Sequence, residues 1–153
     1  MNQKIFFFIA LFFPIVNACG KSNENNPPVV DIVELITKDK WTTYDNLVDK
    51  NSSGNFISAT SACNKDDIWA FAPDGKGGAT DGPEACDPDL PLALVFDWNL
   101  KENNTVLVIS FNANGVVYDE IQYSIVSVTE NKLELLRTKP DPSPSKSKIV
   151  LTR

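Results

Sequence analysis

The chain has 153 residues, of which 14 are basic and 20 are acidic, so its formal charge at neutral pH is −6. This length suits one domain. An acidic chain lacks the clustered Lys and Arg that bind phosphate backbones, so we expect no nucleic-acid partner. The chain contains no histidine, which excludes Ser-His-Asp and Cys-His catalytic arrangements. We therefore expect a protein that is not an enzyme, with no cofactor and no metal.

The first residues are organised like a secretory signal peptide. Lys4 precedes an apolar run over residues 5–13, and small residues lead to Cys19. The apolar stretch over residues 5–16 has 12 residues, whereas a membrane-spanning helix needs about 20. We therefore expect residues 1–18 to be a cleaved signal. An ordinary secretory signal would leave Cys19 as a reactive free thiol at the new N-terminus.

The segment Val16-Asn17-Ala18-Cys19 resembles the lipobox of bacterial lipoproteins, although Asn17 departs from the small residue usual at its position. The resemblance implies that Cys19 carries acyl chains such as palmitate, and two or more chains anchor a protein stably. Gly20 follows in place of Asp, which in Gram-negative lipoproteins favours the outer membrane. We expect residues 19–30 to be the lipidated Cys and a flexible tether at the periplasmic face or the cell surface.

Residues 31–37 favour one or two helical turns begun by Asp31, although their Ile and Val also suit a strand. From Lys40 onward, β-type segments alternate with turn clusters. Residues 77–86 are Gly-rich and would be a poor strand, and residues 139–148 are expected to be a surface loop. The predicted strands are 41–47, 67–71, 92–100, 105–111, 116–128, 132–137 and 149–151.

Three of these strands have informative faces. Residues 92–100 alternate, so that one face is fully apolar. Residues 105–111 are apolar on both faces, which indicates a strand covered on more than one side. In residues 116–128, Ile121, Tyr123 and Ile125 share a face, and Asp119-Glu120 is expected to be a break or an edge. About eight short strands joined by short turns predict an all-β, antiparallel, up-and-down eight-stranded barrel.

Cys63 and Cys86 remain as a pair once Cys19 is assigned to lipid. Disulfides persist in exported proteins, so we predict that the two are bridged. A metal site would need more Cys or His ligands. Acidic residues near Cys86 could suit calcium, but their spacing does not match the EF-hand loop, and we interpret them as a polar loop. These residues are Asp81, Glu84, Asp87 and Asp89.

The order of Trp41, the segment 67–71, Phe96-Asp97-Trp98 and the hairpin 123–135 resembles the lipocalin-like domain of small bacterial lipoproteins, over residues 38–153. The resemblance implies an eight-stranded antiparallel barrel, which we assign to residues 31–153. Lipocalins place a first-strand Trp beside a late Arg at one barrel end. Trp41 would take the first position and Arg137 or Arg153 the second, although Asp39 replaces the usual Gly.

An eight-stranded barrel is either filled by side chains or holds one small molecule. Large aromatic residues favour a filled core. If a cavity exists, we expect these residues to line it and the ligand to be small and apolar. The expected function is that of a lipid-anchored, non-enzymatic outer-membrane lipocalin-like protein. The alternative is a protein-interaction or inhibitor module of the cell envelope with a solid barrel core. The candidate cavity residues are Trp69, Phe96, Trp98, Phe111 and Tyr123.

Overall fold

The computed structural model describes residues 31–89, 92–113, 116–140 and 145–153. The predicted signal peptide, Cys19 and the tether lie outside the described residues. The elements are, in chain order, α1 (Ile32–Thr37), β1 (Trp41–Asp49), β2 (Ile57–Ser58), the 3₁₀ turn η1 (Ala62–Asn64), β3 (Ile68–Phe71), β4 (Lys76–Thr80), β5 (Ala93–Lys101), β6 (Val106–Ala113), β7 (Val116–Val128), β8 (Lys132–Lys139) and β9 (Lys146–Thr152).

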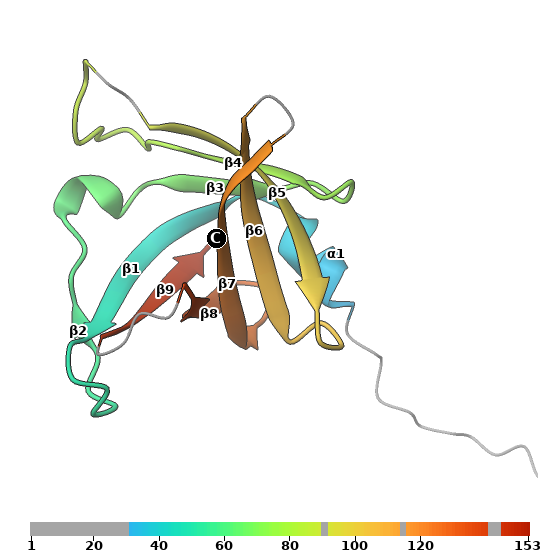
Figure 1. The fold of residues 1–153 in the computed structure, drawn as a ribbon. Helices are drawn as coiled ribbons and strands as arrows, with labels where there is room; N and C mark the ends of the chain where they lie inside the picture. The colour runs from blue at the N-terminus through green and yellow to red at the C-terminus, as the bar shows by residue number, and fades with distance from the viewer. Residues whose placement is uncertain (1–30, 90–91, 114–115, 141–144) are drawn as a thin grey trace, which may run out of the picture.

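The strands form a closed barrel (Figure 1). Each strand from β3 to β9 pairs antiparallel with the next one, and β9 returns to pair with β1 from Thr42 to Asp49. β3 closes the ring by pairing with the start of β1, and β2 is a short addition to the far end of β1. The predicted all-β, up-and-down eight-stranded barrel is therefore confirmed. Full closure leaves few backbone edges open to pairing with other chains.

The helix α1 lies at one end of this barrel (Figure 1). The Asp31 carboxylate accepts hydrogen bonds from the backbone N–H groups of Val33, at 2.9 Å, and Glu34, at 3.3 Å. Such a cap satisfies donors that the first helical turn leaves unpaired. Ile36 is fully buried in the same core cluster as Trp41. The predicted helical turns are therefore confirmed: Asp31 caps the first turn of α1, and Ile36 packs the buried face of the helix into the core.

Phe96 is the centre of the aromatic core. Its ring centroid lies 5.9 Å from that of Trp69, 5.6 Å from that of Phe71 and 6.1 Å from that of Phe111. Alternation along β5 places Phe96 and Trp98 inside, as predicted, while Val95, which precedes Phe96, is 77 % exposed. On β6, Leu107 and Val108 are both fully buried, so both faces of this strand are covered as predicted.

The prediction that residues 77–86 would make a poor strand is wrong for its first part, because β4 includes residues 77–80. A Cβ atom on Gly77 would lie only 2.2 Å from Cε2 of Phe96. The strand therefore needs Gly at this position to make room for the Phe96 ring across the β4–β5 pair. A residue that weakens a strand by its own propensity is here required by packing.

Two boundaries also differ from the sequence predictions. β7 continues through Asp119 and Glu120, which pair with Phe111 and Ser110 of β6 while their own side chains are exposed. The predicted break is therefore wrong, because backbone pairing to β6 outweighs the polarity of two exposed side chains. The predicted loop over residues 139–148 is shorter, since β8 ends at Lys139 and β9 begins at Lys146.

Candidate functional site

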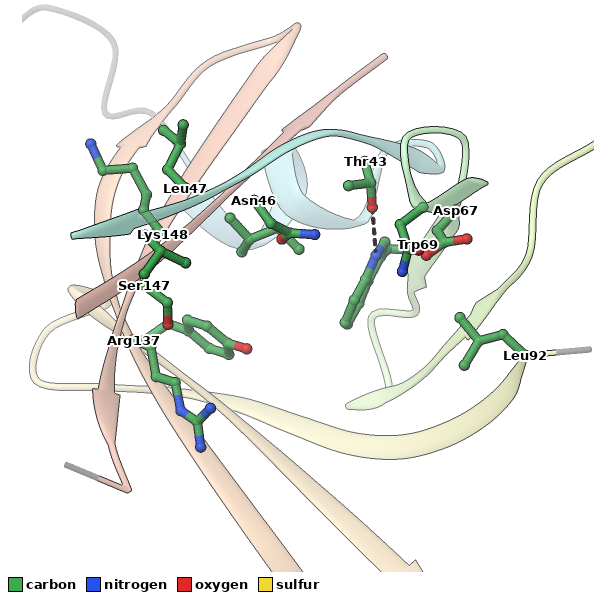
Figure 2. Close-up of a pocket in the computed structure, with 13 residues that line it drawn as sticks. Thr43, Asn46, Leu47, Asp67, Trp69, Leu92, Arg137, Ser147 and Lys148 are labelled. Atoms are coloured by element: carbon green, nitrogen blue, oxygen red, sulfur yellow. Dashed lines mark hydrogen bonds between the residues drawn. The ribbon is translucent and has the colours of Figure 1, made fainter. Parts of the chain in front are cut away.

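A cavity of about 300 Å³ lies where β1 and β3 separate (Figure 2). The two strands pair only at Trp41 and Thr42, after which the N–H of Thr43 donates to the carbonyl oxygen of Asp67 at 2.8 Å. Farther along, β1 pairs with β2 instead, from Leu47. The barrel wall therefore opens on this side, at the end away from α1. The lining residues are Thr43, Asn46, Leu47, Val48, Asn64, Asp67, Trp69, Leu92, Tyr123, Arg137, Ser147, Lys148 and Ile149.

Trp69 forms an apolar wall of this cavity. Its Nε1–H donates to Oγ1 of Thr43 at 3.1 Å, the contact drawn in Figure 2. Thr43 is only 2 % exposed, and the Trp69 ring also contacts Phe96. The ring is therefore held on two sides, and its polar atom already has a partner. Trp69 offers a ligand a fixed aromatic surface and no free hydrogen-bond donor.

Tyr123 and Arg137 are cross-strand partners on β7 and β8 and line the cavity together. Burial raises the pKa of the Tyr123 phenol, and the nearby Arg137 guanidinium opposes that shift. The phenol is therefore neutral at physiological pH. Nε of Arg137 is buried without a hydrogen-bond partner in the part of the chain that the structure describes. This wall combines an aromatic ring with a cation that has spare hydrogen-bonding capacity.

Asp67 is the acidic group of the cavity. Strand alternation from Trp69 and Phe71 turns its side chain inward, and it is only 7 % exposed. Its Oδ1 atom has no hydrogen-bond partner among the described residues. Burial raises the pKa of this carboxyl, and the nearby Asp81 and Asp66 raise it further. Asp67 can therefore accept a hydrogen bond, or donate one when it is protonated.

Lys148 contributes its stem to the lining but directs its charge elsewhere. On β9 it alternates with Ser147 and Ile149, and in Figure 2 its amine points away from the cavity. Nζ lies 3.7 Å from an oxygen of Glu134 and 5.0 Å from the ring centroid of Phe56. Among the described lining residues, Arg137 is thus the cation that faces the cavity.

The structure brings two of the five predicted cavity residues to the cavity, namely Trp69 and Tyr123. Phe96, Trp98 and Phe111 lie in the packed core instead. The barrel interior is therefore divided, with a filled aromatic core toward α1 and a cavity at the other end. The polar lining, especially Asp67, Asn46 and Ser147, was not predicted. Strand alternation was the signal that could have found Asp67, because it shares a face with Trp69 and Phe71.

The two candidate arginines lie at opposite ends of the barrel. The guanidinium carbon of Arg153 lies 3.9 Å from the ring centroid of Trp41, and its Nη2 donates to the carbonyl oxygen of Leu35 at 2.7 Å. Arg153 therefore holds the barrel end beside α1, where Trp41 also donates to the carbonyl oxygen of Ile36. Arg137, the other candidate for this position, lies at the cavity.

The predicted disulfide is present and lies beside the cavity. Cys63 on η1 is bonded to Cys86, with a Cα–Cα distance of 5.0 Å, and its neighbour Asn64 lines the cavity. The disulfide therefore ties one rim of the cavity to the segment that follows β4. No group of three or more Cys, Asp or Glu residues in the described ranges is placed to hold a metal ion. No helix in the described part of the chain has the length and apolar character needed to span a bilayer.

Comparison with known proteins adds one structural likeness. No protein-family model matches the chain, and no curated protein matches it. Among solved structures, the bovine lipocalin allergen Bos d 2 is similar, with a TM-score of 0.47 and 16 % sequence identity over 80 % of this chain and 75 % of that one. The barrel itself is established by the strand pairing of this chain, so its fold class is a closed antiparallel barrel of eight strands, with the short helix α1 among the described residues.

Proposed function

We propose that this protein binds a small molecule in the cavity between β1 and β3, without catalysing a reaction. The observation that carries the proposal is a cavity of about 300 Å³ with two aromatic walls and two buried polar atoms that lack partners among the described residues. Small-molecule sites commonly begin at about this volume and combine apolar walls with a few polar groups. The same cavity favours ligand binding over a module with a solid barrel core.

We further infer that the protein is held at the outer membrane by acyl chains on Cys19. The lipobox-like segment ending at Cys19 and the polar residues that follow it support this proposal. Residues 19–153 carry 13 basic and 20 acidic residues, a formal charge of −7, which does not favour electrostatic docking on anionic lipid. Attachment would therefore depend on the acyl chains.

Ligand binding is tested by native mass spectrometry of protein purified from its own envelope. We expect a bound small-molecule mass on the wild-type protein and its loss in Ser147→Phe, which fills the cavity from β9. Lys146→Phe is the matched control, because it adds the same ring one residue earlier at an exposed position. Equal bound mass on both variants, or none on the wild-type protein, would overturn the proposal.

Membrane attachment is tested by mass spectrometry of the mature N-terminal peptide. We expect an acylated Cys19 and a protein that fractionates with the outer membrane. Cys19→Ala should move the protein into the soluble fraction. An unmodified N-terminus at Cys19 would contradict the anchor while leaving the ligand proposal intact.

A further inference from the structure

Two groups of opposite charge face the cavity from opposite sides. Figure 2 shows Asp67 on the side of β3 and Arg137 on the side of β8, and both residues line the cavity. Each has a buried polar atom without a partner in the described ranges, Oδ1 on Asp67 and Nε on Arg137. A buried polar atom without a partner costs free energy, which a ligand that supplies the partner recovers.

Asp67 and Arg137 form no salt bridge with each other in the part of the chain that the structure describes. The neighbours that act on the pKa of Asp67 are Asp81 and Asp66, while Arg137 acts on the pKa of Tyr123. Three carboxyl groups thus lie together on the β3 side, and Oδ1 of Asp66 also lacks a partner among the described residues. This side attracts a cation or a strong hydrogen-bond donor. The β8 side, where Arg137 stands beside the neutral Tyr123, attracts an anion.

The space between the two charged sides is apolar in part. Trp69 stands on the Asp67 side and Tyr123 on the Arg137 side, and Leu92 and Ile149 also contribute to the lining. Aromatic walls favour a flat apolar body between them. The small apolar ligand that the sequence predicts would therefore contact the apolar walls of this cavity but would leave its two charged sides without a partner.

We propose that the cavity selects a small zwitterion whose charges stand at opposite ends of a flat apolar body, with its cationic group bound by Asp67 and its anionic group by Arg137. This inference rests on the proposed ligand-binding function and specifies its ligand class.

The inference is tested by isothermal titration calorimetry on the mature chain carrying Cys19→Ala. The probe is 4-(aminomethyl)benzoate, with a charge at each end of one ring. Three probes keep the ring and lack one or both charges: 4-methylbenzylamine, 4-methylbenzoate and 4-methylbenzyl alcohol. We expect the zwitterion to bind about tenfold more tightly than either singly charged probe, since a charge-assisted contact is commonly worth about one decade or more in Kd.

Two variants assign each charge to its residue. In Asp67→Asn, the zwitterion should bind no better than 4-methylbenzoate, because the cationic group has lost its partner. In Arg137→Gln, it should bind no better than 4-methylbenzylamine. Asp89→Asn and Lys101→Gln remove one charge each at exposed positions outside the lining and should leave all four affinities unchanged.

Each other outcome counts against the inference. Equal affinity for the four probes would overturn charge selection and leave the ligand-binding proposal standing. Equal weakening of all four probes in Asp67→Asn would show that Asp67 maintains the cavity and does not contact a cation. Absence of binding by every probe, while native mass spectrometry still records a bound small molecule, would overturn the inference alone. Absence of both would overturn the proposed function as well.

Discussion

At the residue scale, Asp67 couples the cavity to pH. Its carboxyl is buried beside Asp66 and Asp81, and these surroundings raise its pKa above the ordinary value of 3.8. Between the ordinary and the raised pKa, the folded protein binds more protons than the unfolded chain does. The free energy of unfolding therefore decreases as pH rises through that window.

Asp67→Asn removes the charge at every pH, so it removes this destabilisation. We expect the free energy of unfolding of the variant, minus that of the wild-type protein, to be larger at pH 7 than at pH 3. Urea unfolding at the two pH values measures the difference. An identical difference at both pH values would contradict the raised pKa of Asp67.

Arg153 is the residue on which the α1 end of the barrel depends. Its guanidinium lies against the Trp41 ring and also donates to the carbonyl oxygens of Leu35 and Glu130. Arg153→Gln should therefore lower the free energy of unfolding by about 1–3 kcal/mol, through loss of the cation–π contact and of charged hydrogen bonds.

The control for Arg153 is Lys38→Gln. It removes the neighbouring exposed ion pair with Glu130, and pairs of this kind contribute at most about 1 kcal/mol. Urea unfolding of both variants tests the comparison. An equal loss in the two variants would mean that the Trp41 contact is not what stabilises this end.

At the element scale, β4 shows how packing overrides local propensity. Gly77 lies opposite Phe96, and a Cβ there would also approach the carbonyl oxygen of Ala70 to 2.8 Å. Gly77→Ala should lower the free energy of unfolding by about 1–3 kcal/mol, because the Phe96 ring must leave its place in the aromatic core.

A double-mutant cycle separates this clash from the strand itself. In a Phe96→Leu background, where the ring is absent, Gly77→Ala should cost less than in the wild-type protein. Only partial relief is expected, because the backbone contact with Ala70 remains. Additive costs in denaturant unfolding would show that Phe96 is not the reason for the glycine.

At the scale of the whole molecule, the disulfide supports the side on which the barrel opens. β1 is paired with β9 along most of its length but with β3 only at Trp41 and Thr42. The Cys63–Cys86 bond joins the segment before β3 to the segment after β4, and the two cysteines are 23 positions apart in the sequence. It therefore restrains the unfolded chain and the cavity rim together.

The double variant Cys63→Ser/Cys86→Ser should lose roughly 3 kcal/mol of unfolding free energy, as expected for a closed loop of this length. Reduction of the wild-type protein should produce the same loss, which provides a control free of substitution. Urea unfolding with and without reductant makes the measurement. A loss well below 1 kcal/mol in both cases would contradict a stabilising role.

Several features were predictable from sequence because their signals are local. Alternation in residues 92–100 identified the inward face of β5, Asp31 indicated the helix start, and two remaining cysteines in a chain predicted to be exported indicated the disulfide. The number and order of strands predicted the closed barrel. The assignments that concern Cys19 also come from local sequence and lie outside the described residues.

The division of the barrel interior was decided only by tertiary structure. Alternation shows that Trp69 and Phe96 both point inward, but it does not show that one lines a cavity and the other a packed core. It also does not show that Asp67 and Arg137, 70 positions apart, face one cavity from opposite sides. The physical reason is that the cavity exists where β1 leaves β3, and that separation follows from the long-range pairing of β1 with β9 together with its pairing with the neighbouring β2.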